Sequence, residues 1–112
     1  MISVTRYITA DNTDVLSGTD LAQIPDQGTL GLYIASTQAD TVVTITGPGI
    51  EPAGRLITVQ LRTNGQPNQS DDLGYLLPVV QGGKYVINVD VVTAATVGII
   101  ASFTSDLEQE LA

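Results

Sequence analysis

The stretch Gly47–Arg55 contains the pattern G-x-x-x-x-G-Arg, which differs by one residue type from the opening of a phosphate-binding loop. Such a loop needs a Lys that reaches the phosphates, then a Ser or Thr that binds magnesium, and then a helix whose N-terminus faces the anion. In this chain Arg55 replaces the Lys, Leu56 replaces the Ser or Thr, and the following residues alternate as a strand would. Glu51 would also repel a phosphate. The segment is therefore predicted to be a bend between two strands and not a nucleotide site.

The acidic residues are the second group that could carry chemistry. Calcium takes six to eight oxygen ligands, and an EF-hand loop spaces them as D-x-D-x-D-G with a Glu at position twelve. Neither Asp11-Asn-Thr-Asp14 nor the pair Asp71-Asp72 has this spacing. Paired carboxylates also hydrolyse glycosides, but they must flank a cleft, which a domain of this size would offer only in shallow form. We predict no metal site, and a cation that bridges loops stays open as an alternative to solvated acids.

Nucleophilic catalysis lacks its usual residues. The chain contains no His and no Cys, so a Ser or Thr nucleophile would need a Lys or a carboxylate as its base. Lys84 is the only lysine, and it follows two glycines at the start of a predicted strand, where a charged residue is ordinary. We therefore predict that the protein is not an enzyme and that it uses no cofactor.

The charge distribution narrows the classes of partner. The net charge is -8, and the four cations are spread along the chain at Arg6, Arg55, Arg62 and Lys84. Because phosphates are neutralised by clustered Lys and Arg, we expect no binding to nucleic acid or to an anionic membrane. No apolar run approaches the ~20 residues of a membrane-spanning helix. The N-terminus also lacks the basic and apolar segments of a secretory signal, so synthesis in a cytoplasm is expected.

Period-two alternation of apolar and polar residues is the dominant signal, as in half-buried antiparallel strands. Two runs are weaker, because Arg6 interrupts the apolar face of one and Pro78 lies in the other. Since proline cannot donate to a strand ladder, the run with Pro78 is expected to be an edge strand or to end early. The clear runs cover residues 29–36, 41–46, 55–63, 84–91 and 96–103, and the weaker runs cover residues 2–9 and 73–80.

Six or seven short strands without a long helix predict an all-β fold, either an antiparallel β-sandwich or a jelly-roll-like barrel of about seven short strands. We expect an N-terminal arm at residues 1–28, a β-sandwich domain at residues 29–104 and an acidic tail at residues 105–112. Strand 2–9 joins either this domain or a neighbouring chain. The arm is expected to be irregular, with a helical turn near residues 20–24, and a capping box of Ser105 and Glu108 predicts a short helix in the tail.

The alternation also predicts which side chains face the core. Tyr85 and Phe103 lie on apolar faces, whereas Tyr7 and Tyr33 lie on the opposite faces. The predicted core comprises Leu32, Ile34, Val43, Ile45, Ile57, Val59, Leu61, Ile87, Val89, Val97 and Ile99. Apolar residues on the outer faces are Leu56, Leu76, Val80, Val86, Val92 and Ile100. Such outward side chains indicate that another chain covers part of the sheet surface, or that the arm or tail of the same chain does so.

The arm is the candidate segment for binding a partner. Extended segments of this kind add a strand to the sheet edge of another chain through main-chain hydrogen bonds. The residues expected to contact the partner are Ile2, Val4, Tyr7, Ile8, Val15, Leu16 and Leu21.

Four segments carry a resemblance to a known family. They are Leu16–Thr19 (L-x-G-T), Ile24–Leu30 (IPDQGTL), Thr41–Pro48 (TVVTITGP) and Pro78–Val89 (PVVQGGKYVINV). In this order they resemble the small head decoration proteins, also called cement proteins, of tailed bacteriophages. The resemblance covers roughly residues 14–104. It implies a β-rich, oligomeric protein without catalytic residues, which binds the outside of the capsid lattice across junctions between major capsid protein subunits.

The expected function is therefore structural: a virion protein, made in the host cytoplasm, that decorates and stabilises a phage capsid. The alternative is a phage-tail or cell-surface β-sandwich module that recognises a receptor or a glycan. Glycan binding usually relies on exposed aromatic platforms, and the chain has no Trp.

Overall fold

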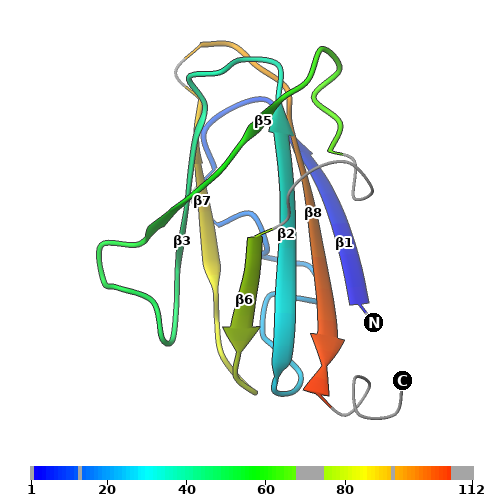
Figure 1. The fold of residues 1–112 in the computed structure, drawn as a ribbon, viewed down its shortest axis with the longest axis vertical. Helices are drawn as coiled ribbons and strands as arrows, with labels where there is room; N and C mark the ends of the chain where they lie inside the picture. Colours follow the sequence, from blue (N-terminus) through cyan, green and yellow to red (C-terminus); the bar gives the residue numbers. More distant parts are fainter. Residues whose placement is uncertain (1, 13, 68–74, 92, 107–112) are drawn as a thin grey trace.

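The computed structural model describes residues 2–12, 14–67, 75–91 and 93–106. Within these ranges the chain is almost entirely β, and its strands form two sheets (Figure 1). The predicted all-β class is confirmed, and the two sheets are compatible with a β-sandwich. The helix predicted for the acidic tail falls almost wholly on residues 107–112, outside the described residues.

The larger sheet has five strands, and its centre is a long antiparallel pair. This pair joins β2 (Gly28–Ser36) to β8 (Val97–Ser105) over nine residues in each strand. On the far side of β8 lies β1 (Ile2–Ile8), also antiparallel. The other side of β2 is shared by β6 (Tyr75–Val79), which is antiparallel, and by β5 (Gln60–Leu61), which is parallel. The parallel pair departs from the purely antiparallel fold expected from the sequence.

The smaller sheet has three antiparallel strands in the order β4-β3-β7. These strands are β3 (Val42–Thr46), β4 (Arg55–Ile57) and β7 (Val86–Asp90). The free edge of β7 is not bare, because Asn12 exchanges two backbone hydrogen bonds with Val89, at 3.0 and 2.7 Å. The chain before β2 therefore runs alongside the smaller sheet after β1 has joined the larger one.

The apolar residues of both sheets form a single core cluster. The residues predicted for the core are buried there, apart from Val59 and Leu61. Val59 is half-buried and packs against the cluster, whereas Leu61 is 63% exposed. Tyr85 and Phe103 are buried, as predicted, and Tyr7 is exposed.

The run 55–63 was expected to be one strand, and it is two. β4 pairs with β3 in the smaller sheet, whereas β5 pairs with β2 in the larger sheet, so the chain crosses from one sheet to the other (Figure 1). The crossing separates Arg55–Ile57 from Gln60–Leu61. The apolar side chains of the run therefore no longer face one core surface, as they would in a single continuous strand. Leu61 then lies on a strand of two residues at the edge of the sheet, where little covers it.

The segment 1–28 was expected to be an irregular arm, but its described residues belong to the fold. β1 pairs with β8 along all seven of its residues. The following segment forms successive turns, such as the hydrogen bond from the Ala22 N–H to the Thr19 carbonyl at 3.1 Å, and no helix. Val15, Leu16 and Leu21 lie fully inside the core cluster. The physical reason is that a chain this small gains core volume only by burying the apolar side chains of its own N-terminus.

Two leucines that the sequence places in the same core provide a stability test. We expect Leu32→Ala to lower the free energy of unfolding by about 2–5 kcal/mol, because Leu32 is 1% exposed and its removal leaves a cavity. Leu61→Ala removes the same atoms from a side chain that is 63% exposed, so it should cost no more than about 0.5 kcal/mol. Urea denaturation of both variants measures the difference, and equal losses would contradict the strand break at β5.

Candidate functional site

The stretch Gly47–Arg55 is the hairpin loop between β3 and β4. Two of its backbone N–H groups are used within the loop: Ile50 donates to the Gly47 carbonyl at 3.1 Å, and Gly54 donates to the Glu51 carbonyl at 2.8 Å. No helix follows the loop, and the Arg55 guanidinium donates to the Tyr75 hydroxyl at 2.9 Å. The prediction of a bend between strands is confirmed, and the loop leads into β4 and not into the helix N-terminus that a phosphate site needs.

The loop is held in place by Tyr85. The Tyr85 hydroxyl donates to the Pro48 carbonyl at 3.2 Å, and the ring passes over Gly47. A Cβ at Gly47 would lie 2.5 Å from the Tyr85 Cδ1 atom, so only glycine fits beneath the ring. Gly47 therefore allows the ring to pack against the loop.

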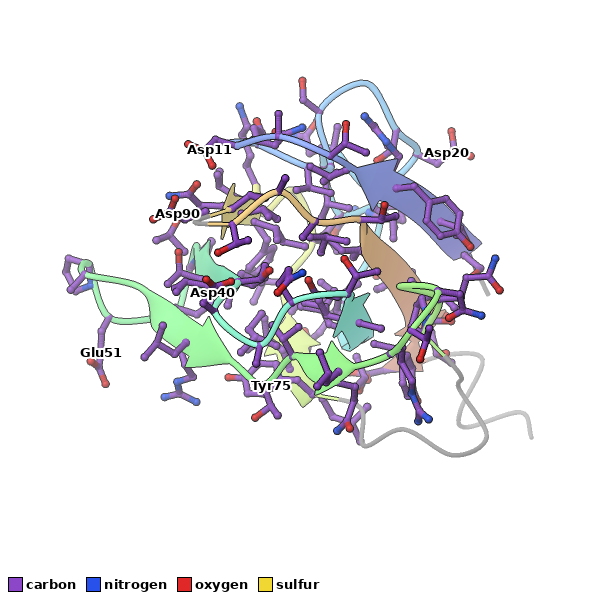
Figure 2. All side chains as sticks on the ribbon, turned by 90° about the horizontal axis from the view of Figure 1, so that it is seen from above. Asp11, Asp20, Asp40, Glu51, Tyr75 and Asp90 are labelled. Atoms are coloured by element: carbon purple, nitrogen blue, oxygen red, sulfur yellow. The ribbon has the colours of Figure 1, made fainter. Side chains whose placement is uncertain are left out.

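The described acids do not gather into one cluster. Asp20 and Glu51 are on opposite sides of the molecule (Figure 2). The Asp11 carboxylate accepts a hydrogen bond from the Val91 N–H at 2.8 Å. No group of three or more acids with metal-binding geometry occurs among the described residues, and the pair Asp71-Asp72 lies outside them.

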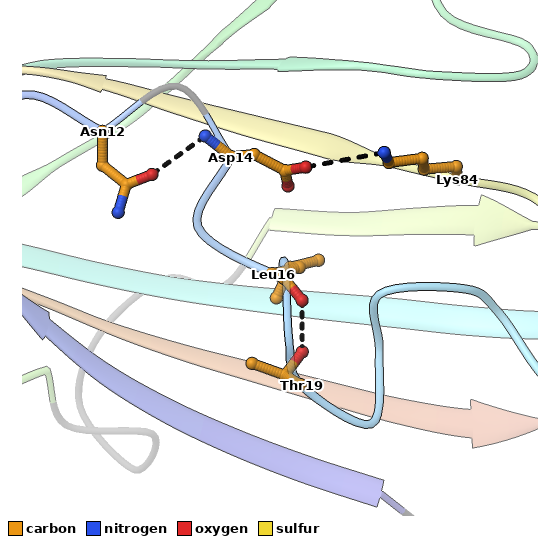
Figure 3. A network of polar contacts seen from close by, with 5 residues as sticks. All are labelled: Asn12, Asp14, Leu16, Thr19 and Lys84. Carbon is orange, nitrogen blue, oxygen red and sulfur yellow. Dashed lines mark hydrogen bonds and ion pairs between the residues drawn. The ribbon is translucent and has the colours of Figure 1, made fainter.

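Lys84 has a structural partner. Its ammonium nitrogen lies 3.7 Å from the Asp14 carboxylate, and the Asp14 N–H donates to the Asn12 side-chain oxygen at 2.9 Å (Figure 3). The Lys84 side chain is 66% exposed, so this ion pair contributes little stability. It links Asp14 to the chain just before β7, and the Val15 N–H donates to the Ile87 carbonyl of β7 at 3.0 Å.

The residues predicted to bind a partner divide into two groups. Val15, Leu16 and Leu21 are buried in the chain's own core, as is Ile8, so they cannot contact another chain while the segment stays folded. The structure therefore removes them from the candidate surface. The remaining three all lie in β1: Ile2 and Val4 are half-buried against the core, and Tyr7 is 54% exposed.

Arg6 explains why the alternation of this strand looked imperfect. Its position in the register, between Val4 and Ile8, turns the side chain to the inner side of the sheet. There the guanidinium donates to the Val15 carbonyl at 3.2 Å. The residue that seemed to interrupt the apolar face therefore links β1 to the segment that covers β7.

Exposed apolar side chains lie on the outer faces of both sheets. Leu56 opposes Thr44 in the smaller sheet, and Leu76 opposes Gly31 in the larger sheet. They are 71% and 66% exposed, and Val80 is 47% exposed, as the alternation predicted. Val86 and Ile100 are half-buried, and Val92 lies outside the described residues. Val42, which the sequence did not single out, is also exposed and stands beside a groove where β4 leaves β3.

This groove has a volume of about 280 Å³. Val42, Leu56, Thr41 and Thr58 are among its lining residues, and the Thr41 hydroxyl is already bonded to the Ser36 hydroxyl at 2.7 Å. No aromatic residue lines it. The arrangement offers mainly apolar contact, and no acidic or basic side chain lines the groove.

Comparisons with protein-family models, with curated proteins and with solved structures find no match to this chain. No helix among the described residues is long and apolar enough to span a membrane.

The packing of Tyr85 on Gly47 can be tested with a double-mutant cycle. We expect Gly47→Ala to destabilise the protein by about 1–3 kcal/mol, because the added methyl group overpacks against the ring. In a Tyr85→Leu background the same substitution should cost less, since the shorter side chain vacates part of that space. Thermal or urea unfolding of the four proteins gives the coupling energy. An equal cost in both backgrounds would show that the ring is not the reason for the glycine.

Proposed function

We propose that this chain is a structural virion protein that binds the outside of a phage capsid and stabilises it by bridging neighbouring major capsid protein subunits. A protein that binds the assembled lattice and hardly binds free subunits stabilises the lattice by mass action. The chemistry of the described residues supports a role of this kind, because contact surfaces are present and a catalytic constellation is not found among them.

The observation that carries the proposal is the position of Leu56 and Leu76. Each is a large apolar side chain more than 60% exposed, and they lie on the outer faces of different sheets. A bridging protein needs two contact surfaces that point away from each other, and the two sheets supply them. Exposed apolar side chains of this size are typical of surfaces that other proteins cover.

The strand order supports the jelly-roll form of the fold. Without the two-residue β5, the larger sheet runs β1-β8-β2-β6. Asn12 and Val15 hydrogen-bond to β7, and when they are counted as a strand, the smaller sheet consists of this strand followed by β7, β3 and β4. Two sheets with this order have the arrangement of a jelly roll, which occurs in viral capsid proteins and in lectins. The fold analogy therefore agrees with the proposal but does not by itself separate it from sugar recognition.

The second candidate is a β-sandwich module that binds a receptor or a glycan. The groove between Val42 and Leu56 favours it, because the exposed polar residue Thr58 is among its lining residues. Its volume of about 280 Å³ is small for a ligand site, and it has no aromatic wall. The capsid proposal needs no enclosed site and agrees better with this surface.

The proposal is tested by sedimenting the full chain with capsids that lack their native decoration. We expect the wild-type protein to co-sediment, and Leu56→Ser or Leu76→Ser to weaken binding by about ten-fold each, because each removes apolar contact from one face. Leu61→Ser is the matched control. Leu61 is 63% exposed but opposes the buried Ser36, so its side chain does not lie on an outer face. This substitution should leave capsid binding unchanged.

Salt dependence is a second readout of the same experiment. Arg6, Arg55 and Lys84 all have partners within the chain, so apolar packing should dominate the contact. Binding should therefore change by less than about three-fold up to about 0.5 M salt. Absence of co-sedimentation at any salt concentration, together with binding to host cells or glycans, would favour the second candidate.

A further inference from the structure

In the part of the chain that the structure describes, the sheets end in five edge strands, and four of them are shielded against pairing with another chain. β4 and β5 have only three and two residues. β6 carries Pro78, and β7 is covered by Asn12. Short strands, prolines and covering segments are the usual devices that prevent an edge from pairing.

β1 is the exception. It is seven residues long, contains no Pro or Lys, and pairs with β8 in an unbroken register from Ile2 opposite Phe103 to Ile8 opposite Val97. Among the described residues, only β8 pairs with it. Figure 1 shows β1 at the margin of the larger sheet, with no other strand beyond it. A long, regular edge of this kind is a template for another strand.

The register shows which backbone groups of β1 are free. In an antiparallel sheet the N–H and C=O of a residue point to the same side, and the side alternates along the strand. Asp106 donates to the Gln27 carbonyl and Thr37 donates to the Thr96 carbonyl, so the even-numbered residues of β8 point their backbone groups to β2. The odd-numbered residues of β8 therefore point their backbone N–H and C=O groups to β1.

Their partners in β1 are Ile2, Val4, Arg6 and Ile8, whose N–H and C=O groups are thus used by β8. The backbone groups of Ser3, Thr5 and Tyr7 point to the open edge. Pro78 provides an independent check on this alternation. Pro78 opposes Thr29, an odd-numbered residue of β2 whose backbone groups point to β8. The pairing of β6 with β2 therefore needs no N–H at position 78, where proline has none.

We infer that the β1 edge binds the β1 edge of a second copy of this chain, antiparallel and about a two-fold axis through Thr5. Such an axis pairs Thr5 with Thr5 of the second copy and Ser3 with Tyr7 of the second copy. Each of these residues carries one N–H and one C=O, so all free backbone groups of the strand find a partner. A shift of the axis to Ser3 or Tyr7 would leave some of them unpaired.

The side chains agree with this axis. On the inner face the register places Ile2 beside the already buried Ile8 of the second copy, and Val4 meets the aliphatic part of Arg6 of the second copy. Ile2 and Val4 are only half-buried in the single chain, so the contact extends the core across the axis. On the outer face the two Thr5 side chains meet, and such threonine pairs are favourable between strands.

Arg6 opposes the contact and sets its strength. An inward-pointing charge on an edge strand disfavours pairing, and the two Arg6 side chains would lie diagonally across the axis. Each guanidinium is already bound to the Val15 carbonyl of its own chain at 3.2 Å. With a net charge of -8 on each copy as well, the dimer is expected to be weak and to become tighter as salt screens these repulsions.

This inference does not depend on the proposed function, since it concerns the isolated protein. If both hold, the dimer presents two copies of each outer face, which raises its avidity for a repeating lattice. The test below uses no capsid, so its outcome is separate from that of the sedimentation experiment.

The experiment exploits the self-pairing of Thr5. We expect sedimentation equilibrium of the wild-type protein to give a monomer–dimer transition with a Kd of about 1–100 µM. Thr5→Lys alone and Thr5→Glu alone should each weaken association by about ten-fold, because like charges then face each other across the axis. An equimolar mixture of the two variants should restore association to within about three-fold of wild type. Ser17→Lys and Ser17→Glu, in an exposed turn, form the matched control and should behave as wild type in every combination.

Amide hydrogen exchange gives a second readout that involves no substitution. At low protein concentration the N–H groups of Ser3, Thr5 and Tyr7 should exchange fast and those of Val4 and Arg6 slowly, because β8 protects only the latter. At high concentration the first group should gain protection. A wild-type protein that stays monomeric to about 1 mM, variants that do not rescue each other, or protection at Ser3, Thr5 and Tyr7 that is independent of concentration would each overturn the inference.

Discussion

The pairing of β2 with β8 is the interaction on which the rest of the structure depends. It runs over nine residues in each strand and leaves the other side of β8 for β1. Because side chains and backbone groups both alternate along antiparallel strands, this one register decides which residues face the smaller sheet. It also requires close approach at the start of β2, where a Cβ at Gly28 would lie 2.2 Å from the Thr104 carbonyl oxygen.

The second constraint is the small size of the chain. With 112 residues, few side chains are available to fill the space between two sheets and to cover their edges. The segment that follows β1 does both, because Val15, Leu16 and Leu21 enter the core while Asn12 covers β7. A truncation that removes the N-terminus would therefore remove part of the core, and point substitutions are the appropriate probe of partner contacts.

The candidate surfaces were partly predictable from the sequence. Alternation placed Leu56, Leu76 and Val80 on outer faces, and they are exposed. The turn at Gly47–Arg55 was predicted from its prolines and from the strand after it, and the structure confirms it. Ile8, Val15, Leu16 and Leu21, which were predicted to contact a partner, are buried in the chain's own core, because the apolar pattern of a segment does not say which chain buries it.

The sequence by itself determined the all-β class, most strand positions and the facing of side chains within each strand. These properties are local: the period-two pattern follows from the geometry of an extended backbone. Only the tertiary structure decided that the run 55–63 divides between two sheets and exposes Leu61. It also decided that the N-terminal residues pack into the same domain as the rest of the chain, and that β1 keeps a free edge. Those outcomes depend on which strands lie side by side, and the alternation of a strand is the same whether its neighbour is another strand, a covering segment or water.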